Sequence, residues 1–286
     1  MKGNTILKTA GTEQRWDKVI VADKKGQRYW ADLWDFRGLF FFLVWRDILV
    51  RYKQTVFGIA WSIIRPVLTM VVFSVVFGRI AKLPDGGTPY PILVYAAMLP
   101  WQFFSSSFSA STMSMISNVN LVSKIYFPRL IIPTATMMVS VVDFVIAFII
   151  YVLLMFFYSI SFSWRMLFLP LFMLMALLSS IGPGVLVSAI AVKYRDFKYI
   201  VPFITQLGLY ISPVGFKSDI IPDRWRLVYS LNPLVGVIDG FRWALLGGEN
   251  TIYVPGIILS STVIILFLIW GIWYFRRAER YFADVI

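Results

Sequence analysis

Residues 130–158 read LIIPTATMMVSVVDFVIAFIIYVLLMFFY, and Asp143 is the single charged residue in this stretch. A helix needs about 20 mostly apolar residues to cross the hydrocarbon core of a bilayer. Helices and closed barrels are the structures that can cross, because in lipid every backbone polar group needs an internal partner. The stretch therefore predicts a membrane-spanning helix, and it sets the fold class of the chain.

The same apolar character continues on both sides of this stretch. Hydrophobic residues make up 59% and charged residues 15% of the 286 residues, against about 45–50% and about 25% in ordinary globular chains. The mean hydropathy of +0.75 agrees. These values predict an all-α integral membrane protein. We expect six transmembrane helices, at about 58–80, 91–117, 130–158, 166–192, 199–214 and 253–275.

The distribution of positive charge predicts the orientation. The net charge is +12, and 20 of the 27 lysines and arginines fall in residues 1–65, 118–129, 193–198 and 276–286. Cytoplasmic loops carry an excess of lysine and arginine, so we expect both termini in the cytoplasm. The basic residues flank membrane segments, which favours anionic lipid headgroups as their partners and disfavours nucleic acid.

Absent residue types limit the chemistry of the chain. It has no cysteine and no histidine, which removes thiolate ligands, the commonest general base and the commonest zinc ligand. It also lacks the G-x-x-x-x-G-K-[ST] loop that binds ATP phosphates. We expect no catalytic residue, no metal site and no cofactor bound by this chain. An integral-membrane transferase is a weaker alternative, because the outer acids Asp219 and Asp223 lie among basic residues instead of clustering for acid–base work.

Residues 31–55 predict an amphipathic helix that lies along the cytoplasmic membrane surface, after a cytoplasmic segment of residues 1–30 and before a transmembrane domain of residues 56–286. Aromatic side chains recur on one helical face and charged ones fall mainly on the other. Tryptophan and phenylalanine favour the membrane interface, although a solvated helix packed on a soluble partner is the alternative. The candidate interface or gate residues are Trp34, Phe41, Trp45, Arg46, Arg51 and Tyr52.

Residues 212–248 combine frequent prolines and glycines with apolar runs. Such breakers exclude a single long helix. Two short apolar half-helices, broken at Asn232-Pro233, predict a re-entrant hairpin in the outer leaflet, where irregular backbone must be buried in protein or line a wet cavity. An extracellular amphipathic loop is the alternative.

Asp143 is a functional candidate because ionisable groups inside membrane spans are expensive. It lies about ten residues beyond Pro133, or roughly 15 Å into the bilayer at about 1.5 Å per residue. A proton-coupled secondary transporter usually needs more than one such group. We therefore favour a structural role, in which the carboxylate pairs with a basic side chain or a hydroxyl and holds helices together.

The second predicted span carries rows of serine beside aromatic residues. Ser107, Ser111, Ser114 and Asn118 recur at helical spacing. Hydroxyls on one face either line a polar path or bond across a helix interface, and the spacing does not separate these readings. Serines beside aromatic rings suit a sliding glycan, which offers hydroxyls and apolar C–H faces. The candidate substrate-path residues are Trp101, Phe104, Ser107, Phe108, Ser111 and Ser114.

The loop NVNLVSKIYFPR at residues 118–129 joins the second and third predicted spans. It is short and contains Lys124 and Arg129. It is either a plain turn or a short helix that docks into a soluble partner.

Three sets of residues, taken in order, resemble the ABC-2 type permeases, and most closely the polysaccharide and polyol-phosphate exporters. The first set is Arg46-Asp47-Ile48, Arg51-Tyr52, Gly58-Ile59-Ala60-Trp61 and Arg65-Pro66. The second is Tyr194-Arg195-Asp196, and the third is Ser212-Pro213-Val214-Gly215-Phe216, Pro222, Asn232-Pro233, Arg242 and Gly247. The resemblance begins at about Leu33 and covers nearly all of the chain beyond it.

The resemblance implies a half-transporter. Two copies of the chain would pair with two separate ATPase subunits, which would hold the ATP and Mg, in a bacterial inner membrane. The cargo would be a lipid-linked O-antigen, capsule or teichoic acid chain; a drug or lipid exporter of the same family is the alternative. The resemblance assigns ATPase coupling to Asn118, Lys124, Tyr126, Tyr194, Arg195 and Asp196. It assigns the outer hairpin to Pro213, Phe216, Asn232, Pro233 and Arg242.

Overall fold

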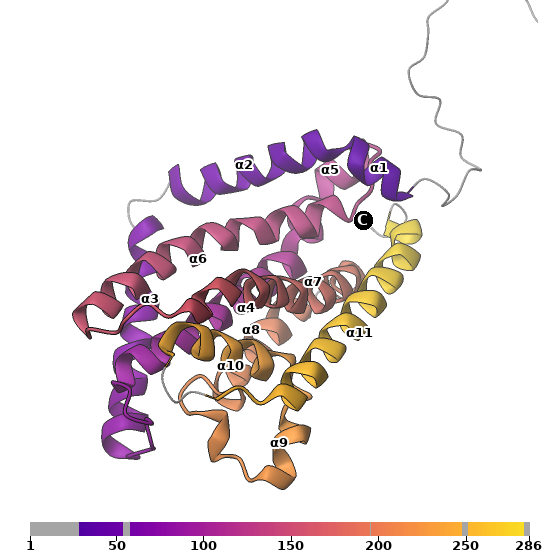
Figure 1. Ribbon diagram of the computed structural model, residues 1–286. Helices are drawn as coiled ribbons and strands as arrows, with labels where there is room; N and C mark the ends of the chain where they lie inside the picture. The colour runs from indigo at the N-terminus through magenta and orange to yellow at the C-terminus, as the bar shows by residue number, and fades with distance from the viewer. Residues whose placement is uncertain (1–28, 54–57, 195, 248–250, 283–286) are drawn as a thin grey trace, which may run out of the picture.

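The computed structural model describes residues 29–53, 58–194, 196–247 and 251–282, and every regular element in these ranges is helical (Figure 1). The longer helices are α2 (Arg37–Lys53), α3 (Gly58–Phe73), α4 (Tyr90–Ser117), α6 (Ile131–Phe157), α7 (Leu169–Lys193), α8 (Phe197–Ile211), α10 (Pro233–Leu246) and α11 (Val254–Ala278). The short ones are α1 (Tyr29–Asp35), α5 (Val119–Lys124) and α9 (Asp223–Tyr229). A π-helical turn, η1 (Ser74–Ile80), prolongs α3, and 3₁₀ turns occur at η2 (Trp164–Phe168), η3 (Ser218–Ile220) and η4 (Glu279–Tyr281).

A helix lies at each of the six ranges that the sequence predicts as spans. Four helical segments of the described chain are long and apolar enough to cross a membrane: Ala60–Ile80, Ile131–Phe157, Trp164–Lys193 and Val254–Ala278. Helix α4 has 28 residues and sufficient length, but its serines lower its hydropathy. Helix α8 has 15 residues, which at about 1.5 Å per residue is shorter than the roughly 30 Å hydrocarbon core.

Helix α4 is the central helix of the bundle and packs against α6, α7 and α10 (Figure 1). Its first half is sealed on all sides, since every residue from Ile92 to Leu99 is at most 2% exposed. A helix that is apolar all round belongs in a core. Helix α4 therefore fixes the positions of the helices around it.

Helices α7 and α11 approach each other backbone to backbone. A Cβ added at Gly271 would lie 2.2 Å from the carbonyl oxygen of Gly182, and one at Gly182 would lie 2.7 Å from the backbone nitrogen of Leu268. Membrane helices pack closely where small residues let their backbones meet. These two glycines therefore set the spacing of the α7–α11 pair.

Helices α1 and α2 form the predicted interface helix, up to Lys53. Residues 54 and 55 of the prediction lie outside the described ranges. A single turn residue, Phe36, separates the two helices, while the bonds from Phe36 N to Asp32 O (2.9 Å) and from Phe40 N to Phe36 O (3.2 Å) keep helical spacing across it. Helix α2 lies along the first half of α6 (Figure 1).

Helix α2 has two apolar faces, of which the sequence pattern identified one. Leu43, 2% exposed, packs with Ile131 and Ala135 of α6. Trp34, Phe41 and Trp45 point the other way and are 71%, 66% and 62% exposed. The prediction of one apolar and one charged face is therefore corrected: part of the supposed polar side is the apolar strip that rests on the protein.

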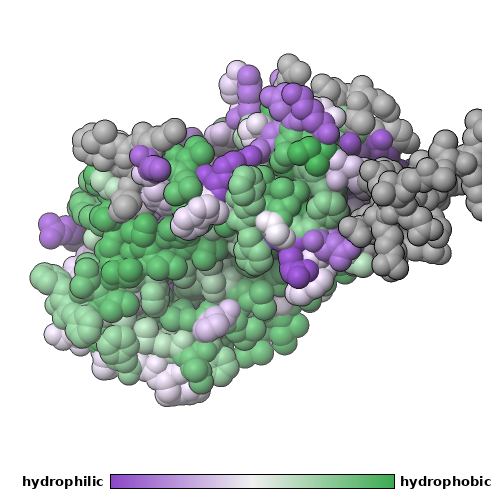
Figure 2. Space-filling model, turned by 90° about the horizontal axis from the view of Figure 1, so that it is seen from above, coloured by the Kyte–Doolittle hydropathy of each residue, from purple (hydrophilic) through white to green (hydrophobic). Residues whose placement is uncertain are grey.

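Much of the outer surface is apolar. Figure 2 shows a broad area of hydrophobic side chains on one face, with hydrophilic residues gathered toward one edge. Soluble monomers rarely expose apolar patches larger than a few hundred Å². A surface of this kind fits a lipid environment or contact with another subunit.

Candidate functional site

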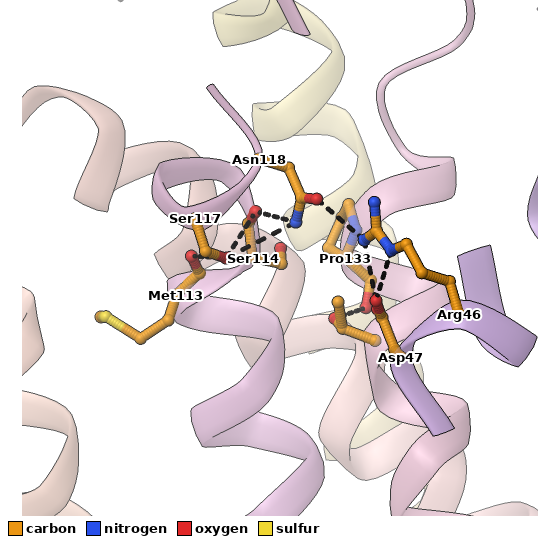
Figure 3. Close-up of polar contacts among 8 residues, drawn as sticks. Arg46, Asp47, Met113, Ser114, Ser117, Asn118 and Pro133 are labelled. Carbon is orange, nitrogen blue, oxygen red and sulfur yellow. Dashed lines mark hydrogen bonds and ion pairs between the residues drawn. The ribbon is translucent and has the colours of Figure 1, made fainter. Parts of the chain in front are cut away.

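The turn between α4 and α5 is tied to helix α2. Asn118 donates from Nδ2 to the carbonyl of Ser114 at 2.9 Å, and its Oδ1 accepts from Nη2 of Arg46 at 2.9 Å (Figure 3). Arg46 also forms an ion pair of 2.7 Å with Asp47. One amide side chain thus closes the end of α4 and binds the interface helix at the same time.

Helix α5 and the residues just after it expose polar and aromatic side chains, and buried side chains hold this segment on the bundle. Val122 and Phe127 are 3% and 4% exposed and hold the loop onto the bundle. Lys124 is exposed, and Tyr126 is 70% exposed. The structure therefore places two predicted coupling residues at the surface, whereas Asn118 serves the internal connection.

The second predicted coupling segment follows the end of α7 at Lys193. Tyr194 is 53% exposed, and the Lys193 ammonium lies 5.1 Å from the centre of its ring. Asp196 is exposed and precedes α8. Arg195 lies outside the described residues, so its predicted role has no structural description here.

The serine row of α4 faces the interior of the bundle. Ser107 and Ser111 are fully buried, and within the described ranges their hydroxyl oxygens have no hydrogen-bond partner. Ser114 is 1% exposed and donates to the carbonyl of Ser111 at 2.6 Å. A Cβ added at Gly184 of α7 would lie 3.0 Å from Ser111. In one chain, therefore, this row is a helix-packing face.

The aromatic members of the predicted path divide between interior and surface. Trp101 and Phe108 are 5% and 4% exposed, whereas Phe104 is half-buried. The rings of Phe104 and Phe108 stack with centroids 5.6 Å apart and planes at 11°. The partly accessible polar side of α4 carries a neighbouring set of residues: Gln102, Ser105, Ser106 and Ser109.

Asp143 joins three helices, as the structural reading of this residue predicts. Its Oδ2 forms an ion pair of 2.6 Å with Arg51, and its Oδ1 accepts hydrogen bonds from the Tyr52 hydroxyl at 2.6 Å and the Ser62 hydroxyl at 2.7 Å. Burial and the bond to the Asp143 carboxylate raise the pKa of Tyr52 to about 12. The charge inside the span is thus compensated by partners from α2 and α3.

The predicted outer-hairpin residues converge on one cluster. Arg242, 3% exposed, donates to the carbonyls of Phe216 (2.6 Å), Val214 (2.9 Å) and Leu93 (3.3 Å). Buried arginines need such partners. Its guanidinium therefore closes the irregular backbone that follows α8.

The break at Asn232-Pro233 separates α9 from α10. Asn232 caps α10 by accepting from Leu234 N at 3.1 Å, and its Nδ2 donates to the Ser212 hydroxyl at 2.9 Å. Pro233 occupies the first helical position, where its missing N–H has no cost. Pro213 is buried beside Ser212.

A cluster beside α1, the loop after α5 and the end of α11 was not visible in the sequence. Glu279 accepts from Arg129 N at 2.8 Å and from the Tyr29 hydroxyl at 3.1 Å, while Arg129 Nη1 donates to the Glu279 carbonyl at 2.6 Å. Burial raises the pKa of Glu279. Tyr29 and Glu279 are 250 positions apart, and no local spacing joins them. The cluster ties the loop after α5 to both ends of the described chain.

Comparison with known proteins finds several that are named for export or transport. The chain is 26% identical over 251 residues to the O-antigen export system permease protein RfbA of Klebsiella pneumoniae, covering 84% of this chain and 92% of that protein. It is 25% identical over 260 residues to RfbA of Myxococcus xanthus, covering 89% and 98%. It is 24% identical over 208 residues to the polysialic acid transport protein KpsM of Escherichia coli, covering 71% and 79%.

The profile of the ABC-2 type transporter family matches residues 38–246, which extend from the start of α2 to the end of α10 and include the α4–α5 turn, the Asp143 junction and the Arg242 cluster. Long apolar helices make the chain a multi-pass membrane protein. We conclude that it belongs to the ABC-2 type transporter family.

Proposed function

We propose that this chain is the permease subunit of an ATP-driven exporter that moves a lipid-linked polysaccharide out of the bacterial cytoplasm across the inner membrane. The observation that carries the proposal is the extent of its likeness to proteins named for O-antigen export, which spans 92% and 98% of their lengths. A permease named without a substrate, YadH of Escherichia coli, matches over 38% of this chain. The longer matches favour a polysaccharide cargo.

In this proposal the ATPase is a separate protein, because the chain has no P-loop sequence. Two ATPase subunits, each holding ATP and Mg, dock on two copies of the permease. The docking surface consists of Lys124 at the end of α5, Tyr126 just after it, and Tyr194, Arg195 and Asp196. Support for α5 comes from its exposed polar side and its buried anchors.

The proposed transmembrane arrangement has six spans, both termini in the cytoplasm, and α9 and α10 as a re-entrant hairpin in the outer leaflet. The break at Asn232 and the burial of Arg242 support the hairpin, because irregular backbone at membrane depth must be satisfied within the protein. Helix α4 crosses the membrane despite its seven serines, since Ser107, Ser111 and Ser114 are buried against neighbouring helices.

The glycan path lies between the two copies. The accessible side of α4, with Gln102, Ser105, Ser106 and Ser109, is the polar surface available for it in one chain. Phe104 is the half-buried aromatic residue of the predicted substrate-path set. The buried members, Ser107, Ser111 and Ser114, support the path by packing α4 on α6 and α7.

Deletion of the gene tests the function. We expect the deletion strain to accumulate lipid-linked glycan in the cytoplasm and to lose it from the envelope. Complementation with the intact gene restores export. A strain with a normal envelope and increased sensitivity to a drug would instead support a drug exporter, the alternative within the same family.

A further inference from the structure

A cavity of 540 Å³ lies among α3, α4, α6 and α8, beside the end of α2. Its size falls within the range of small-molecule sites, which is about 300–1,000 Å³. One part of its lining is polar and includes Arg51, Arg65, Gln102, Ser105 and Asp143. Another part is apolar and includes Leu99, Phe103, Phe144 and Leu209. A mixed lining of this kind suits an amphiphile.

Arg65 is the unusual residue of this lining. It lies seven residues beyond the first residue of α3, or roughly 10 Å along the helix axis at about 1.5 Å per residue. Its side chain is exposed, and among the described residues its guanidinium has no hydrogen bond or ion pair. An arginine within a membrane span is expensive and marks a functional site by default. No partner among the described residues neutralises this charge.

Arg51 contributes a second guanidinium to the same lining, but its charge is engaged with Asp143 at 2.6 Å. The lining thus carries two positive charges and one negative charge. Guanidinium groups match phosphate oxygens in a planar, bidentate geometry. An anion that enters the cavity would meet Arg65 directly and would compete with Asp143 for Arg51.

We propose that this cavity binds the phosphate group of an amphiphile. Arg65 donates hydrogen bonds to the phosphate at all times, whereas Arg51 is shared between the phosphate and Asp143. The apolar wall holds the first part of the attached chain. The identity of the natural ligand rests on the proposed function: in a polysaccharide exporter it is the phosphorylated lipid end of the cargo, whereas a membrane phospholipid offers the same chemistry.

The competition has a structural consequence. The same Asp143 carboxylate holds Tyr52, so a phosphate that draws Arg51 away weakens the attachment of α2 to α6. Binding at the cavity and the position of α2 are therefore linked, and by reciprocity a variant that weakens the Asp143 pair must strengthen phosphate binding.

Binding of four probes to the purified full-length chain in micelles of a phosphate-free detergent, dodecyl maltoside, tests the site. The probes are farnesyl diphosphate, dihexanoyl phosphatidylglycerol, farnesol and inorganic diphosphate. We expect the two phosphate-bearing amphiphiles to bind and farnesol and inorganic diphosphate to bind far more weakly. The tighter of the two amphiphiles identifies the source of the phosphate. Equal affinity for farnesol and farnesyl diphosphate, or for the inorganic and farnesyl diphosphates, would overturn the proposal.

Variants with opposite expected effects sharpen the test. Arg65→Ala should weaken farnesyl diphosphate binding by about tenfold or more, since hydrogen bonds to charged groups are worth more than neutral ones. Asp143→Asn should tighten binding severalfold, because Arg51 loses its competing carboxylate. The control is Arg79→Ala, which removes an exposed arginine of η1, the turn that prolongs α3. It should leave the affinity for farnesyl diphosphate unchanged.

Because Arg65 is exposed, its substitution decides the question even if Asp143→Asn does not fold. If Arg65→Ala binds farnesyl diphosphate with unchanged affinity, the proposed phosphate site is wrong. The purified chain could bind the probes while deletion of its gene leaves the envelope glycan normal. This pair of results would reject the proposed function and keep the phosphate site.

Discussion

The guanidinium of Arg46 lies 2.9 Å from the side-chain oxygen of Asn118, although 72 positions separate the two residues in the chain. Arg46 is on α2, along the outside of the bundle, and Asn118 closes α4 at the start of the α5 loop. The contact therefore joins the interface helix to the loop that we propose as an ATPase docking surface. Beside this polar contact, Leu43 of α2 and Val122 of α5 belong to one buried apolar cluster, so the two elements are connected twice.

Removal of either partner should loosen this connection. Arg46→Ala and Asn118→Ala should each lower the free energy of unfolding by about 0.5–1.5 kcal/mol, near the lower end because Arg46 is partly exposed, and their effects should not add. Thermal unfolding of the two single variants and the double variant in detergent measures the coupling. Arg37→Ala, whose guanidinium donates to the Trp34 carbonyl three residues earlier, is the matched control. Additive losses would mean that the contact transmits nothing.

The exposed side of α5 should determine coupling to the ATPase. Lys124→Glu combined with Tyr126→Ala should reduce export strongly while the variant still folds and reaches the membrane, since both side chains are solvent-facing. Export assayed together with ATP hydrolysis in the purified complex checks this. Arg224→Glu reverses an exposed charge on α9, at the opposite end of the bundle, and should leave both activities intact. Export that survives the double substitution would reject the docking role.

The positions of the long helices could be predicted because a run of about 20 apolar residues in lipid has one main solution, a helix. The rotation of each helix about its axis could not. On α2, the side of the buried Leu43 and the side of the exposed Phe41 and Trp45 are both apolar, and burial in protein and contact with lipid favour the same side chains. Similarly, the Ser107 row and the Ser105 row of α4 have the same spacing, and only packing against α6 and α7 separates them.

The pairing of Asp143 could be predicted in kind, because an isolated carboxylate within a span has to find a partner. The identity of its partners could not, since Arg51 and Ser62 come from helices far away in the sequence. The Glu279 cluster had no signal at all. Its acid lies after the last predicted span, in a stretch that resembles an ordinary charged end.

The backbone contact between α7 and α11 predicts that Gly271 does not tolerate a side chain. A methyl group there would lie 2.2 Å from the Gly182 carbonyl oxygen, which is rigid backbone. Gly271→Ala should therefore destabilise the protein by about 1–3 kcal/mol, as overpacking does. In Gly38→Ala, on the exposed side of α2 with nothing within 4 Å of the new methyl group, stability should instead rise by about 0.5–1 kcal/mol. Thermal unfolding of the pair in one detergent measures both signs, and equal behaviour would contradict the close approach.

The burial of Glu279 predicts a particular dependence of stability on pH. Because burial raises its pKa, the folded protein holds this proton more tightly than the unfolded chain does. Its contribution to stability is therefore greatest below the usual pKa of a glutamate and falls as the pH rises through the raised value. Glu279→Gln keeps one acceptor oxygen for Arg129 N, can donate from its amide to the Tyr29 hydroxyl and has no proton to lose, so its melting temperature should decline less than that of the wild type between pH 4 and neutrality. Asp223→Asn, which removes an exposed acid at the start of α9, should reproduce the wild-type slope. A Glu279→Gln curve parallel to the wild-type curve would mean that the cluster of Glu279, Arg129 and Tyr29 holds an ordinary, solvated carboxylate.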